Sequence, residues 1–189
     1  MIRTGAARMP EPAAALLYDC PLPRSPLAGI AMPATLPDAT LTERTGLTLL
    51  HVDAGRGPMP ERIASLALPT VPDTSDMPDC EDGPAALWIG PGRWMLVFPK
   101  GVQPIQAPGL TVVDLSHARC VLRLAGPGTW GVLARGCLLD LTRETFDAGR
   151  CAQTQMHGIP VLLHAVDFDT VDVHVPRSYA LDLWERLAG

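Results

Sequence analysis

The sequence predicts an α+β protein in which strand patterns outnumber helix patterns. Short apolar runs recur along the chain, separated by turns that contain glycine or proline, as is typical of antiparallel strands. Helix patterns are fewer, and those expected begin at a proline or follow a serine. Between residues 111 and 188 the predicted order is two strands, a short helix, three strands and a closing helix.

In the first half, residues 46–52 form an apolar run suited to one strand. Pro60 has the fixed φ of a first helical residue, and apolar residues follow at helical spacing, so we expect a helix over residues 60–68. The segment 85–98 reads as a hairpin, because two apolar runs flank Gly90-Pro91-Gly92. This strand–helix–strand–strand order predicts a faint repeat of the second half.

In the second half we expect strands at residues 111–114 and 119–124. A short helix should then start at Pro127 and end at Gly136, because proline favours a helix start and glycine a helix end. Residues 150–156 and 159–165 are expected to pair across a turn at His157-Gly158.

The last strand and the closing helix have clear patterns. Val171, Val173 and Val175 alternate with polar residues, which predicts a strand with one buried and one wetter face. Ser178 is a good N-cap for a helix whose apolar residues recur at every third position.

Residues 1–40 contain seven prolines, which argue against a helix or a central strand. A frayed terminus is one interpretation. The apolar residues among the prolines favour an extended arm that docks on a partner. We therefore expect an arm over 1–40 and a single compact unit over 41–189, with halves of about 41–105 and 106–189.

Composition excludes several classes of function. The formal net charge is −5 and Lys100 is the only lysine, whereas a protein that binds nucleic acid needs clustered positive charge. No apolar stretch approaches the roughly 20 residues that cross a membrane. The five cysteines form no CxxC pair, so reduced thiols and a cytoplasmic location are expected.

Residues 126–131 spell the glycine pattern G-x-G-x-x-G of dinucleotide-binding sites, and Asp147 follows about 20 residues later. Such a site needs free backbone N–H groups at the helix start, and Pro127 removes one of them. The helix is also too short for a normal crossover. A strand exit and helix start explain this pattern better than a nucleotide site.

The remaining candidates for chemistry have simpler explanations. The five histidines show no metal-ligand spacing, although His164, His174 and Cys151 could be neighbours on adjacent strands. Cys137 follows a helix C-terminus, which does not activate a thiol. Asp114 is the best single carboxylate for proton transfer, but an aspartate at a strand end is more often a turn cap. We therefore expect no catalytic, cofactor-binding or metal-binding residue.

Partner contact is the function that these residues favour. Trp88 and Trp94 flank a tight turn and could anchor a partner protein, although core packing also explains them. Arg150 and Arg177 stand where strands or helices begin and could pair with carboxylates of a neighbour. The expected interface residues are Leu22, Leu27, Trp88, Trp94, Arg150 and Arg177.

A set of short sequence patches extends over roughly residues 25–187: Ser25-Pro26-Leu27-Ala28, Ala86-Leu87-Trp88-Ile89-Gly90-Pro91, Trp94-Met95-Leu96, Val113-Asp114-Leu115-Ser116, Val121-Leu122-Arg123-Leu124, Gly126-Pro127, Gly136-Cys137-Leu138-Leu139-Asp140-Leu141, Gly149-Arg150-Cys151-Ala152-Gln153-Thr154 and Val175-Pro176-Arg177-Ser178. Together these patches resemble the gamma subunit of heterotetrameric sarcosine oxidase.

The resemblance implies a fold like the folate-binding domain of aminomethyltransferases, with two β2-α-β3-α halves. It also implies a complex that oxidatively demethylates sarcosine to glycine. FAD, FMN, NAD and tetrahydrofolate would then belong to partner subunits, and this chain would pack against them without a cofactor of its own. The expected partners are the alpha, beta and delta subunits.

Two alternatives stay open. One is a folate-binding, aminomethyltransferase-like protein with Asp114 as proton acceptor. The other is a scaffold subunit of a different amine-oxidising flavoenzyme.

Overall fold

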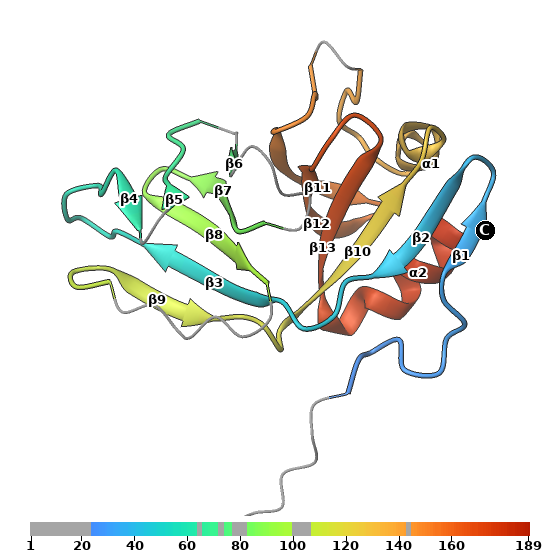
Figure 1. Ribbon diagram of the computed structural model, residues 1–189, viewed down its shortest axis with the longest axis horizontal. Helices are drawn as coiled ribbons and strands as arrows, with labels where there is room; N and C mark the ends of the chain where they lie inside the picture. Colours follow the sequence, from blue (N-terminus) through green and yellow to red (C-terminus); the bar gives the residue numbers. More distant parts are fainter. Residues whose placement is uncertain (1–23, 64–65, 72–73, 77–82, 100–106, 143–144) are drawn as a thin grey trace, which may run out of the picture.

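Two antiparallel sheets make up most of the protein in this computed structural model (Figure 1). The structure describes residues 24–63, 66–71, 74–76, 83–99, 107–142 and 145–189. The strands of the six-stranded sheet, in spatial order, are β1 (Ala34–Leu36), β2 (Ala39–Glu43), β10 (Arg119–Ala125), β13 (Thr170–Pro176), β12 (Ile159–Ala165) and β11 (Cys151–Met156). Those of the five-stranded sheet are β6 (Thr74–Asp76), β7 (Ala85–Gly90), β8 (Arg93–Phe98), β3 (Thr48–Asp53) and β9 (Thr111–Asp114).

The second half follows the predicted order of strands and helices. β11 and β12 pair directly, and the turn between them has positive φ at both His157 (50°) and Gly158 (82°). Two such residues give the turn twist that matches the twist of the paired strands. The predicted hairpin is therefore confirmed.

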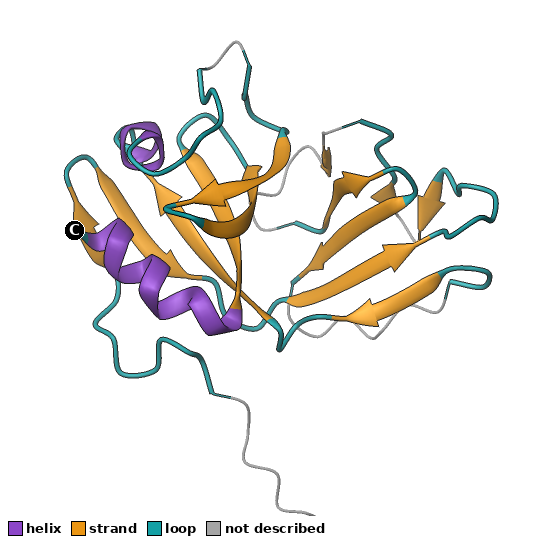
Figure 2. Ribbon diagram, turned by 180° about the vertical axis from the view of Figure 1, so that it is seen from behind, coloured by secondary structure: helices purple, strands orange, loops and turns teal. Residues whose placement is uncertain are grey.

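Helices cover the outer face of the six-stranded sheet (Figure 2). The helix α2 (Ala180–Ala188) packs Leu183, Trp184 and Leu187 onto the apolar face of β10, β12 and β13. The shorter α1 (Thr129–Ala134) adds Val132 and Leu133 to the same core. Ser178 does not cap α2, because a 3₁₀ turn over Arg177–Tyr179 precedes the helix and shifts its start.

The prediction that one face of β13 is more exposed to solvent than the other is wrong. Asp172 and His174 are as buried as Val171, Val173 and Val175, with which they alternate. Their face of the sheet packs toward the five-stranded sheet, where Val121 and Leu162 join Leu49, Leu87, Met95 and Val97 in a shared core. A single strand pattern cannot reveal that a second sheet covers its polar side.

The first half departs from the predicted repeat. The expected helix over residues 60–68 is wrong: its described residues form a small hairpin of β4 (Arg62–Ile63) and β5 (Leu66–Ala67). Ile63 and Leu66 still point inward and pack with Trp94 and Leu96 on the outer face of the five-stranded sheet. The spacing of these apolar residues correctly predicts that they are buried, but it does not distinguish a helix from a hairpin. The first-half strands, in contrast, are confirmed.

The end of the expected N-terminal arm belongs to the sheet. β1 and β2 form a hairpin, and β2 pairs with β10 from Glu43 to Thr40. Leu27, further upstream, is buried in the same core. The fold as a whole is α+β with few helices.

Candidate functional site

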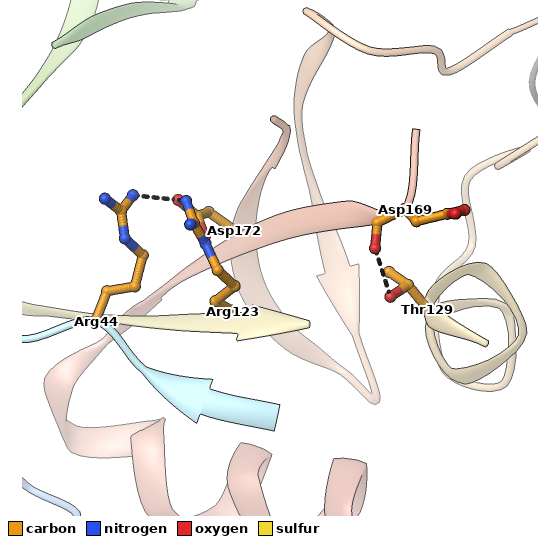
Figure 3. A network of polar contacts seen from close by, with 5 residues as sticks. All are labelled: Arg44, Arg123, Thr129, Asp169 and Asp172. Carbon is orange, nitrogen blue, oxygen red and sulfur yellow. Dashed lines mark hydrogen bonds and ion pairs between the residues drawn. The ribbon is translucent and has the colours of Figure 1, made fainter. Parts of the chain in front are cut away.

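A buried cluster of charged side chains lies on the inner face of the six-stranded sheet (Figure 3). Asp172 on β13 accepts hydrogen bonds from Arg123 on β10, with Nε–Oδ1 at 2.7 Å and Nη2–Oδ2 at 3.1 Å. Arg44, just after β2, approaches the same carboxylate at 2.6 Å from Nη1 to Oδ2. The antiparallel register places Arg123 directly opposite Asp172, so the sheet itself fixes the pair.

The chemistry of Asp172 is that of a permanent anion. Burial alone would raise its pKa, but the Arg123 hydrogen bonds and the charges of Arg44 and Arg123 hold the pKa below its usual value. Asp172 is 1% exposed, so it is sequestered from solvent. A carboxylate with these properties stabilises an arrangement of strands and is unsuited to exchanging protons with a substrate.

Two histidines lie beside this ion pair. His164 is the register partner of Asp172 and of Cys151, while His174 lies two residue pairs further along, opposite Leu162. The expected proximity of these three residues is confirmed, and the two histidines are buried. Burial lowers the pKa of His174 to about 3, and its ring nitrogens have no hydrogen-bond partner among the described residues. His174 is therefore a neutral core residue at ordinary pH.

A cavity of about 540 Å³ opens where the two sheets are linked. The chain crosses from β2 to β3 and from β9 to β10 at this point (Figure 1). The lining residues are Arg24, Ser25, Pro26, Glu43, Arg44, Thr45, Gly46, Leu47, Leu49, Ser116, His117, Arg119, Cys120, Val121 and Arg177. Burial, and next the charge of Glu43, raise the pKa of the Cys120 thiol far above its usual value. Cys120 is thus an unreactive thiol.

The G-x-G-x-x-G pattern serves packing. The N–H of Gly128 donates to Asp38 O at 2.8 Å, and that of Gly126 donates to Asp169 O at 2.9 Å. A Cβ on Gly128 would lie 2.4 Å from Pro37 O, so glycine is required where the β1–β2 turn meets α1. Thr129 Oγ1 also donates to Asp169 O (Figure 3). These N–H groups are already used and offer no cradle for a phosphate.

Asp114 is a turn cap, as its position at a strand end predicts. Its Oδ1 accepts hydrogen bonds from the Ser116 hydroxyl at 2.5 Å and the Ser116 N–H at 2.8 Å. These two bonds lower the pKa of Asp114. A stabilised carboxylate of this kind is a weaker base.

The expected interface residues fall into two groups. Leu27 and Trp94 are each 1% exposed, and packing within this chain accounts for both side chains. Trp88 is half-buried between two core clusters, Arg150 is exposed, and Arg177 lines the cavity. Leu22 lies outside the described residues.

Sequence reasoning missed the charged groups that the structure brings together. Arg123 and Asp172 each interrupt an apolar strand, and that interruption was the available signal. Their pairing spans 49 residues, and Arg44 joins from 128 residues away, so no local spacing reveals them. The arginine-lined cavity depends on the same long-range assembly.

The described residues contain neither a cluster of metal ligands nor a helix that could span a membrane. No group of three histidine, cysteine, aspartate or glutamate side chains in these segments is arranged to hold a metal ion. No helix among them has both the length and the apolar character that spanning a membrane requires.

Three sarcosine oxidase gamma subunits are similar in sequence. Those of Arthrobacter sp. and Corynebacterium sp. strain P-1 are 36% identical over 89 and 90 residues, which is 43% of this chain and 44% of each relative. That of Corynebacterium sp. strain U-96 is 30% identical over 137 residues, 68% of this chain and 65% of the relative. The chain thus covers less than two thirds of the length of each. No protein-family model matches.

Solved structures extend the similarity to most of the fold. A chain of the heterotetrameric sarcosine oxidase from Corynebacterium sp. U-96, in complex with pyrrole 2-carboxylate, superposes with a TM-score of 0.74 and 26% identity. This match covers 87% of the present chain and 92% of that one. The glycine cleavage system aminomethyltransferase T from Bartonella henselae shares the fold at a TM-score of 0.54 and 18% identity, over 82% of this chain and 47% of that one. The chain is therefore a homologue of the sarcosine oxidase gamma subunit, with an aminomethyltransferase-like fold.

Proposed function

We propose that this chain is the non-catalytic gamma subunit of a heterotetrameric sarcosine oxidase, which demethylates sarcosine oxidatively to glycine. Its role is assembly and stability of the complex. The observation that carries this proposal is the structural match to 92% of a chain of such a complex, together with the sequence similarity to gamma subunits. The described carboxylates and thiols at the site support it too, because Asp172, Asp114 and Cys120 are engaged or unreactive.

The partners in this proposal are the alpha, beta and delta subunits. FAD, FMN, NAD and tetrahydrofolate are bound by those partners, and the complex resides in the cytoplasm. Trp88, Arg150 and Arg177 are the proposed contact residues of this chain.

Co-expression tests the proposal. The tagged chain is produced alone and together with the alpha, beta and delta subunits from the same organism. We expect the lone chain to be colourless and inactive on sarcosine, and the co-expressed sample to show flavin absorbance and sarcosine-dependent hydrogen peroxide. Turnover of sarcosine by the pure lone chain would refute the non-catalytic role.

The contact residues are tested in the same system. Arg150 is exposed, so Arg150→Glu should fold normally and reduce the flavin-coloured protein recovered with the tagged chain. Arg135→Glu makes the same charge change at another exposed arginine and serves as control. Equal recovery of the two variants would remove Arg150 from the interface.

The folate-binding alternative has one observation in its favour, the fold shared with aminomethyltransferase T. Titration of the pure chain with tetrahydrofolate separates the two functions. Saturable quenching of tryptophan fluorescence would favour folate binding, and an unchanged signal would favour the subunit role.

A further inference from the structure

Four arginines line the cavity between the sheets: Arg24, Arg44, Arg119 and Arg177. They come from the N-terminal segment, the end of β2, the start of β10 and the 3₁₀ turn before α2. The whole chain has a net charge of −5, so this gathering of positive charge runs against its composition. A cavity lined by one sign of charge concentrates ions of the opposite sign.

The carboxylates nearby leave most of this charge uncompensated. Among the described residues, Glu43 is the one carboxylate that lines the cavity, and its oxygens accept from Ser25 Oγ at 2.5 Å and Cys120 Sγ at 3.3 Å. Asp172 does not line the cavity, and its single negative charge is shared between Arg44 and Arg123. Among the described lining residues, four guanidinium groups therefore face one carboxylate, which leaves the cavity wall with an excess of positive charge.

Arg119 is the central member of the group. It lies on the inner face of β10, in line with Val121 and Arg123, and it also lines a second cavity of about 170 Å³ beside β11 and β12. No hydrogen bond or ion pair joins its guanidinium to another described residue. Burial lowers its pKa without a neighbouring carboxylate to offset the effect. A half-buried cation without a partner is costly, and a bound anion would remove that cost.

The other lining residues indicate the chemistry of the uncharged part of such a ligand. Pro26, Leu47, Leu49 and Val121 form apolar surface, and Ser116 adds a hydroxyl. The cavity volume lies within the range of about 300–1,000 Å³ that is usual for small-molecule sites. A planar guanidinium matches two oxygens of a carboxylate or phosphate at once, so the arginines favour an oxyanion over a halide.

We propose that this cavity binds a small organic dianion, a dicarboxylate or a phosphate monoester, through Arg119 with Arg24 and Arg177. A charge of −2 complements the excess of positive charge on the cavity wall. The apolar wall accepts a short carbon chain. The proposal concerns the chain itself and does not depend on the subunit role.

Calorimetric titration of the full 189-residue chain at low ionic strength tests the site. The probes are succinate, phenyl phosphate and the neutral analogue succinamide. We expect saturable binding of at least one dianion and none of succinamide, and the tighter of the two dianions identifies the head group. Absence of saturable binding for both dianions would overturn the proposal.

Matched variants locate the site. Arg119→Gln should weaken binding by about tenfold or more, since a charged hydrogen bond contributes about 1.5–3 kcal/mol. Arg24→Gln, at an exposed position on the cavity rim, should weaken it by a smaller factor and carries little risk to folding. Arg135→Gln removes the same charge on an exposed residue of α1's C-terminus and should bind like the parent chain. If Arg119→Gln does not fold, the comparison of Arg24→Gln with Arg135→Gln tests the site instead. Equal affinities for these two variants would refute the site.

Discussion

Asp172 joins three segments that are far apart in sequence. Its carboxylate ties β13 to β10 through Arg123 and to the end of β2 through Arg44. Buried ion pairs often add little stability compared with apolar residues, but removing one member leaves the other charges uncompensated. The ion pair is therefore expected to specify the arrangement of strands more than to strengthen it.

Asp172→Asn should lower the free energy of unfolding by about 3–5 kcal/mol, because it removes the buried negative charge next to two guanidinium groups. Urea unfolding followed by circular dichroism measures the change. Asp182→Asn breaks the exposed pair with Arg186, whose side chains are each 49% exposed, and should cost at most about 0.5 kcal/mol. Similar losses for the two variants would show that the buried pair has no special importance.

His174 should make the protein sensitive to mild acid. Its pKa of about 3 in the folded state lies below the unfolded value near 6.5, so only the unfolded chain binds a proton between these values. Its contribution to stability is thus complete above pH 6.5 and is lost progressively as the pH falls toward 3. Desolvation is the main cause; Asp172 opposes it, while His164, Arg119 and Arg44 add to it.

The measurement is the free energy of unfolding at pH 7.5 and pH 4.5. The parent chain should lose roughly 2–3 kcal/mol at the lower pH, at 1.36 kcal/mol per pH unit below 6.5. His174→Leu should show a smaller loss, because leucine binds no proton. Asp172 does not add to the change in stability between pH 7.5 and pH 4.5, because its lowered pKa affects the free energy of unfolding only below about pH 4. Equal pH dependence in both proteins would contradict this assignment.

At the scale of elements, the contact between the β1–β2 turn and the start of α1 decides how the N-terminal hairpin attaches. Gly128 allows Asp38 O to approach and accept its N–H. This close approach explains a glycine pattern that otherwise indicates a nucleotide site.

Gly128→Ala should destabilise the protein by about 1–3 kcal/mol, because the new Cβ would overlap Pro37 O and force the turn away. Gly131→Ala is the matched control: it lies inside α1, and its Cβ would meet nothing within 4 Å. That change should stabilise the helix by up to about 1 kcal/mol. Thermal unfolding of the two variants would show shifts of opposite sign; shifts of the same sign would contradict the packing explanation.

Elements with strong local signals were predictable, and those fixed by distant contacts were not. The turn at His157-Gly158 and the strands around it follow from local chemistry. The hairpin within residues 60–68 does not follow from local chemistry, because the spacing of its apolar residues also fits a helix, while the sheet on which it packs accommodates a hairpin. β1 was hidden among prolines, which an edge strand tolerates. Arg44, Arg123 and Asp172 meet only through long-range pairing.

At the scale of the whole molecule, the two sheets share one core. Met95 and Leu87 of the five-stranded sheet pack with Val121 and Leu162 of the other. Such a shared core favours one cooperative unfolding transition over two independent ones.

Tryptophan fluorescence can follow each sheet separately. Trp88 and Trp94 report on the five-stranded sheet, whereas Trp130 and Trp184 lie on the helices of the second half. In each of two double variants, one pair of tryptophans is changed to phenylalanine, so that fluorescence reports on the other pair alone. In each variant, the urea midpoint measured by tryptophan fluorescence should equal the midpoint measured by circular dichroism. A separate fluorescence midpoint for either sheet would show that the halves unfold independently.

The pairing of β2 with β10 has a practical consequence for anyone who shortens the protein. A version that starts after Glu43 would leave the backbone groups of Leu122 to Ala125 without their neighbouring strand. Exposed strand edges of this kind recruit other chains, so such a truncation should precipitate or form aggregates.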